Sequence, residues 1–181
     1  MDAKDKKFLL DTNTLIESYR RFYSFSIAQP LWVFLRSEVE AGRVLMLDVV
    51  FDEVIKGNDK LSEWTGSIDF KPIDRRSNDI LGRYAEVMNH IQNSPHYHDN
   101  ALNRSGWASV GHADPWIVAT AKARNHVVVT MEAPSIPALG NNQTSKIKVP
   151  YVCNGLGVGW MNLFETLEYY QFSFSGSKTG R

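Results

Sequence analysis

The chain has 181 residues, of which 43% are hydrophobic and 12% aromatic, so it can build the core of one globular domain. Its 20 basic and 20 acidic residues cancel, and this neutral balance neither supports nor excludes nucleic-acid binding. No apolar stretch approaches the ~20 residues of a membrane span, and the first residues lack the apolar region of a signal peptide. The single cysteine, Cys153, excludes an internal disulfide, so we expect a cytoplasmic protein without a membrane association.

Short apolar runs alternate with helical patterns along the chain. Strands are predicted at residues 8–10, 44–47 and 127–130, and helices at 13–21, 30–42, 49–56, 59–64, 78–91, 115–124 and 162–170. Residues 148–152 fit either a strand or the start of a helix, and residues 92–111 are polar and aromatic without a clear pattern. Strands separated by helices predict an α/β fold with a central parallel sheet. Residues 1–172 would form one domain, and the Ser- and Gly-rich residues 173–181 a flexible tail.

Asp11 is the residue that says most about function. It follows the apolar run 8–10 and precedes a predicted helix. Ligands of parallel α/β sheets gather outside the carboxyl ends of the strands, so a carboxylate there marks a site. The alternative is that Asp11 or Thr12 only caps the helix by accepting hydrogen bonds from its free amides.

Three further acids occupy comparable places. Glu53 lies on the helix after the second strand, Asp114 opens a later helix, and Glu132 follows the strand at 127–130. Each has a plainer interpretation: Asp48 or Asp52 could replace Glu53, Asp114 could be a helix cap, and Glu132 could be a solvated loop residue. Carboxylates brought together without basic partners repel one another, and a hard cation such as Mg²⁺ or Mn²⁺ normally holds them.

Taken in order, these motifs resemble those of PIN-domain ribonucleases, and most closely an uncharacterised, toxin-like branch of prokaryotic PIN-like proteins. The resemblance covers residues 7–172 and rests on the segments at 10–13, 52–59, 113–119, 129–132 and 148–153. It implies a three-layer α/β/α sandwich with a central parallel sheet and an acidic pocket for Mg²⁺ or Mn²⁺. The implied activity is metal-dependent cleavage of single-stranded RNA, as the toxin of a toxin–antitoxin pair.

The resemblance also assigns roles to residues. Asp11, Glu53 and Asp114 would be catalytic acids that bind the metal, and Asn13 and Thr130 would be polar supports close to it. Glu132 would be the fourth catalytic acid, although the common pattern has Asp two residues after the Thr. The segment between Glu53 and Asp114 is longer than in compact PIN domains, which predicts an inserted or extended helical region.

Partners and competing functions follow from the same resemblance. The partners would be single-stranded RNA, an antitoxin protein and a second copy of the chain in a homodimer. Lys56, Arg104 and Lys122 are candidate basic residues at the rim, and exposed Trp107 and Tyr97 could stack on bases.

The aromatic residue after Pro115, Trp116, is instead expected in the core because it lies one turn into an apolar helix. The competing functions are a non-catalytic PIN-like binding or assembly module, a nuclease acting on DNA, and a phosphatase with the same pocket.

Overall fold

A central parallel sheet organises the molecule. The computed structural model describes residues 6–109, 111–135 and 143–174. The strands are β1 (Phe8–Leu10), β2 (Val44–Leu45), β3 (Val127–Val129) and β4 (Trp160–Met161), in the order β2-β1-β3-β4. Every pair is parallel, and Phe8 of β1 lies between Val44 and Val127 of its two neighbours.

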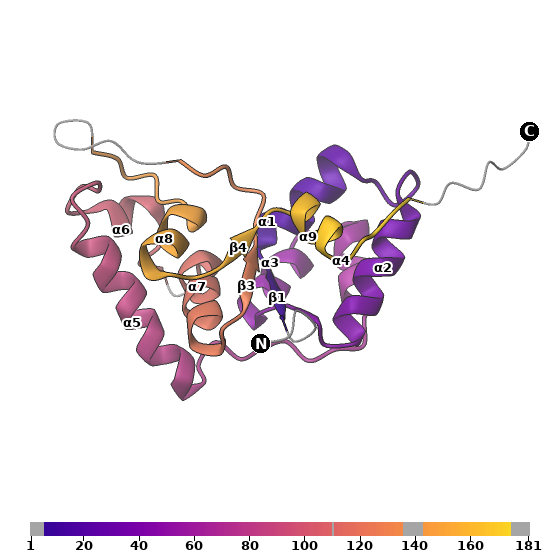
Figure 1. Cartoon of the computed structure of the whole chain (residues 1–181), viewed down its shortest axis with the longest axis horizontal. Helices are drawn as coiled ribbons and strands as arrows, with labels where there is room; N and C mark the ends of the chain where they lie inside the picture. The colour runs from indigo at the N-terminus through magenta and orange to yellow at the C-terminus, as the bar shows by residue number, and fades with distance from the viewer. Residues whose placement is uncertain (1–5, 110, 136–142, 175–181) are drawn as a thin grey trace, which may run out of the picture.

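Helices cover the sheet on both sides (Figure 1). In Figure 1, α5 to α8 lie on one side and α1 to α4 with α9 on the other, which confirms the predicted three-layer α/β/α fold. The helices are α1 (Thr12–Glu17), the π-helix η2 (Ser18–Phe22), α2 (Gln29–Glu40), α3 (Asp48–Ile55), α4 (Lys60–Gly66), α5 (Asn78–Gln92), α6 (Ala101–Ser105), α7 (Ala113–Arg124), α8 (Val149–Leu156) and α9 (Leu163–Tyr169).

Most predicted elements are confirmed, and the differences have local causes. The helix expected at 13–21 is split into α1 and η2, and residues 149–156 form helix α8 rather than a strand. Strand β4 was not predicted, because its two residues are partly exposed and too few to give a period. Helix α6, of five residues, lies within the stretch that showed no pattern.

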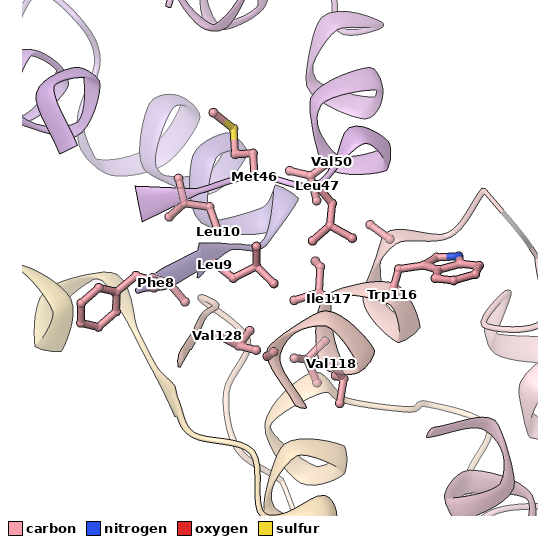
Figure 2. Close-up of a cluster of buried hydrophobic side chains, with 14 of the residues drawn as sticks. Phe8, Leu9, Leu10, Met46, Leu47, Val50, Trp116, Ile117, Val118 and Val128 are labelled. Carbon is pink, nitrogen blue, oxygen red and sulfur yellow. The ribbon is translucent and has the colours of Figure 1, made fainter. Parts of the chain in front are cut away.

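The core lies between the central strands and the helices that cover them. All three residues of β1 and of β3 are buried, as expected for parallel strands with both faces covered. Figure 2 shows Leu9 and Val128 of the sheet beside Ile117 of α7. Trp116 is also buried and its ring stacks on Tyr84 at a centroid distance of 3.8 Å, so its predicted place in the core is confirmed.

Two further expectations concern the C-terminal tail and membrane-spanning helices. Most of the predicted flexible tail, from residue 175 onward, lies outside the described residues. Within the described ranges, no helix combines the length and the hydropathy that crossing a bilayer requires.

Candidate active site

Asp11 lies at the carboxyl end of β1, with its side chain 1% exposed. Its backbone N–H donates to the carbonyl of Val129 at 2.9 Å, which fixes the residue between the two central strands. Although Asp11 occupies the N-cap position of α1, its side chain makes no capping hydrogen bond. Oδ2 accepts a 2.7 Å hydrogen bond from Oγ1 of Thr130, while Oδ1 is buried without a partner. The amide of Asn13 in the first turn of α1 lowers the pKa of Asp11, but helix capping does not explain why Oδ1 is buried without a partner.

The electrostatic surroundings of Asp11 disfavour its charged form. Burial and then the nearby charge of Asp114 raise the pKa of Asp11 to about 7, Glu132 adds to the effect, and the bond from Thr130 opposes it. A buried anion with one unpartnered oxygen beside other anions is stabilised when a cation binds.

Asp114 lies in the first turn of α7, two residues after His112. Nε2 of His112 is 3.1 Å from Oδ2 of Asp114, and this hydrogen bond, with the charges of Asp114, Glu53 and Asp11, raises the pKa of His112. The N-cap residue of α7 is His112, so capping does not account for Asp114. His112 was not among the predicted site residues; its position two residues before Asp114 was the available signal.

Glu53 is the acid of its segment that reaches the pocket. It lies on α3, and its Oε2 accepts a 2.7 Å hydrogen bond from Oγ1 of Thr12 at the start of α1. Asp48 is engaged elsewhere, in an ion pair of 3.0 Å with Arg75, and Asp52 does not line the pocket. The alternatives to Glu53 are therefore not supported by the structure.

Glu132 has both carboxylate oxygens engaged. Oε1 lies 2.7 Å from Nζ of Lys148, and Oε2 accepts a 2.8 Å hydrogen bond from the amide of Val149 at the start of α8. With a side chain only 11% exposed, Glu132 is not the solvated loop residue of the plainer interpretation. It lines the pocket and secures the start of α8 at the same time.

These side chains meet in one pocket of about 460 Å³. Five of the six predicted site residues line it: Asp11, Asn13, Glu53, Asp114 and Glu132. The sixth, Thr130, is buried just behind it and reaches it through its bond to Asp11.

The predictions for the rim are only partly correct. Arg104 lines the pocket, but Lys56 does not, and Lys122 instead donates to the carbonyl of Leu156 at 3.0 Å. The expectation of exposed stacking aromatics is wrong, because Trp107 is 1% and Tyr97 3% exposed. Helix and loop packing around residues 93–109 buries both rings, which their polar sequence neighbours do not reveal.

The donor chemistry of the pocket suits a hard divalent cation. In the parts of the chain that the structure describes, no three His, Cys, Asp or Glu side chains are already arranged around a common metal position. The unpartnered Oδ1 of Asp11 and the carboxylates of Asp114 and Glu53 nevertheless supply only oxygen donors, which Mg²⁺ and Mn²⁺ prefer. The chemistry of these residues therefore fits such an ion.

Comparison with solved structures finds two to which the chain has a distant likeness. The chain resembles VapBC from Salmonella typhimurium, in a DNA-bound crystal structure, with 21% identity and a TM-score of 0.46 over 87% of this chain and 98% of that one. It also resembles VapBC2 from Rickettsia felis, bound to a DNA fragment from its promoter, with 16% identity and a TM-score of 0.48 over 86% and 97%.

One protein-family model matches almost the whole chain. No curated protein matches the chain. Residues 8–174 match a family described as a domain of unknown function, DUF4411. This range agrees with residues 7–172, over which the sequence motifs resemble those of an uncharacterised PIN-like branch. The chain thus belongs to the DUF4411 family.

Proposed function

We propose that this protein is a divalent-metal-dependent endoribonuclease that cleaves single-stranded RNA. One observation carries the proposal: Asp11 is buried with Oδ1 unpartnered, in a pocket that it shares with Glu53 and Asp114. Such an arrangement is unfavourable for a protein without a cation, since the carboxylates repel one another and one of them lacks hydration.

The residues of the pocket would have different roles in the reaction. Asp11 and Asp114 would hold Mg²⁺ or Mn²⁺, with Glu53 positioned beside them by the hydroxyl of Thr12. The bound ion would activate a water and neutralise charge on the phosphodiester. Thr130 fixes the orientation of the Asp11 carboxylate, and Asn13 offers an amide at the pocket wall.

The shape of the pocket favours an unpaired strand. The acids line a concavity of about 460 Å³ rather than a flat face. Residues of α6 and residues 145–148 line this concavity together with the acids, and a flexible single strand can enter a concavity more easily than a rigid duplex.

The test is cleavage of a panel of single-stranded RNA, double-stranded RNA and single-stranded DNA in Mn²⁺, by the wild type and by Asp11→Asn. We expect cleavage of single-stranded RNA by the wild type and a loss of about 10²–10³-fold in the variant, which is the scale of losing a central catalytic electrostatic group. Cleavage of DNA alone would identify a deoxyribonuclease. Equal behaviour of the two proteins, with no cleavage, would identify a non-catalytic PIN-like module.

The biological role that we propose is that of a cytoplasmic toxin held by an antitoxin, with a homodimer as its assembly state. The motif resemblance to toxin-like PIN proteins supports this role. Induced expression of the wild type should arrest bacterial growth, and expression of Asp11→Asn should not. Growth arrest by both proteins would show that toxicity does not depend on the pocket. Light scattering on the purified protein tests the dimer.

A further inference from the structure

We propose that Arg104 and Lys146 bind the phosphate backbone of the nucleic acid that enters the acidic pocket. This inference rests on the proposed function, because it takes the substrate to be a single-stranded RNA. Both residues line the pocket together with Asp11 and Asp114, although they come from segments 42 positions apart (146 − 104).

Hydrogen bonds between two distant segments hold the chain near both cations. Tyr97 and Thr144 form a parallel bridge, in which the amide of Thr144 donates to the carbonyl of His96 at 3.2 Å. Beside it, Nε2 of Gln143 donates to the carbonyl of Pro95 at 3.0 Å. Residues 95–98 are thus joined to residues 143–144, and the chain that follows each of these segments lines the pocket, through Arg104 and Lys146.

The two cations are free for a ligand. Of the three cations that line the pocket, Lys148 is paired, with Glu132 at 2.7 Å. Among the described residues, neither Arg104 nor Lys146 makes an ion pair or a side-chain hydrogen bond, and both are exposed.

The pocket carries both signs of charge. Arg104 and Lys146 line it together with the acids Asp11, Glu53 and Asp114, and among the described residues neither cation is ion-paired with an acid. A phosphodiester strand needs both signs of charge, since its non-reacting phosphates require cations and its reacting phosphate requires the metal held by the acids.

The side chains of Arg104 and Lys146 are suited to binding phosphate groups. The guanidinium of Arg104 presents a fork of donors for two phosphate oxygens, and the ammonium of Lys146 acts as a compact charge. Contacts of this kind position a strand without reading its sequence, so they should act on KM and on salt dependence more than on the choice of base.

The experiment measures the affinity for a labelled single-stranded RNA in the Asp11→Asn chain, which cannot cleave it, at several salt concentrations. Into this chain we introduce Arg104→Gln, Lys146→Gln and the pair. Lys71→Gln is the matched control, since Lys71 is another exposed cation without an ion pair in the described residues and does not line the pocket. Removing one phosphate-binding cation should lower the slope of log affinity against log salt by about 0.7, and weaken binding several-fold at low salt.

The charge-preserving substitutions Arg104→Lys and Lys146→Arg should retain most of the slope, which separates phosphate binding from damage to the pocket. Thermal melting of each variant verifies that it is folded. Equal affinities and slopes for Arg104→Gln, Lys146→Gln and the Lys71→Gln control would overturn the inference, as would a parent chain that binds no RNA. RNA binding that depends on both cations, without cleavage by the wild type, would refute the proposed function and leave this inference standing.

Discussion

Oγ1 of Thr130 donates a 2.7 Å hydrogen bond to Oδ2 of Asp11, across 119 positions of the chain. The same hydroxyl accepts a hydrogen bond of 3.2 Å from the amide of Glu132, so its proton is committed to Asp11. The bond joins the carboxyl ends of the two central strands at the floor of the pocket. It also fixes the direction in which the free oxygen, Oδ1, is held.

Replacing Thr130 tests this relationship. Thr130→Val removes the hydroxyl and leaves Oδ2 of Asp11 buried without a donor, which costs about 1–3 kcal/mol when the carboxylate is charged. We expect weaker Mn²⁺ binding and slower cleavage, measured by calorimetry and by RNA degradation. Thr130→Ser, which keeps the hydroxyl, should behave much more like the wild type. Equal losses in the Val and Ser variants would show that the hydrogen bond is not the cause, because Ser keeps the hydroxyl.

The raised pKa of Asp11 predicts a pH-dependent instability of the metal-free protein. Its folded pKa of about 7 lies above the ordinary value of 3.8, so folding favours the protonated form. The stabilising contribution is complete below pH 3.8 and is lost as the pH rises toward 7 and beyond. Asp11→Asn, which carries no charge, should therefore melt higher than the wild type at pH 8 in a chelator, and the gain should shrink toward pH 5.

For a chain of this length, each kcal/mol of that gain corresponds to roughly 2–4 °C in Tm. Differential scanning calorimetry at pH 5, 6.5 and 8 measures it. A variant that is less stable than the wild type at pH 8 would contradict the assignment of Asp11 as a repelled carboxylate.

Addition of Mn²⁺ should reverse the order of stabilities. An ion that binds only the folded state stabilises it by about 2.7 kcal/mol at one hundred times its Kd. The wild type should therefore melt several degrees higher in Mn²⁺ at pH 8, while Asp11→Asn and Asp114→Asn should hardly respond. Asp52→Asn is the matched control, because this acid does not line the pocket. A shift retained in Asp114→Asn would remove that residue from the ligand set.

Glu132 should prove to be a structural acid more than a ligand. Its oxygens are engaged by Lys148 and by the amide of Val149, so Glu132→Ala exposes the start of α8 and frees Lys148. We expect a loss of about 1–2 kcal/mol in the free energy of unfolding, the scale of losing a helix-terminal carboxylate with a partly buried ion pair. The Mn²⁺ affinity should change much less than in Asp114→Asn. A larger loss of Mn²⁺ affinity than of stability would instead make Glu132 the fourth metal ligand.

Helix α8 is also constrained at Gly155, which does not line the acidic pocket. A Cβ at this position would meet the imidazole ring of His90 on α5, so Gly155→Ala forces that ring to move. Substituting Ala for Gly within a helix ordinarily adds about 0.5–1 kcal/mol of stability, but here we expect a loss of about 1–3 kcal/mol from overpacking. The double variant His90→Ala/Gly155→Ala should lose less than the sum of the two single changes, as measured by urea unfolding.

Much of the fold could be predicted because its signals are local. The apolar runs at 8–10 and 127–130 and the helical periods of α2, α5 and α7 each lie within one segment, so the predicted parallel α/β arrangement is confirmed. Strand β4 and the buried positions of Trp107 and Tyr97 could not be predicted, because they depend on packing between segments. A two-residue strand has no period, and an aromatic residue in a polar stretch reveals its burial only through its neighbours in space.

Local sequence patterns were enough to identify the acids that stand at the ends of strands or the starts of helices, and hence to group Asp11, Glu53 and Asp114 at one edge of the sheet. What each side chain does there required the folded chain. Folding engages Glu132 with Lys148, holds Glu53 through Thr12, sets His112 against Asp114 and leaves Oδ1 of Asp11 alone. The physical reason is that strands and helices follow from local patterns, whereas hydrogen bonds and desolvation depend on atoms contributed by distant segments.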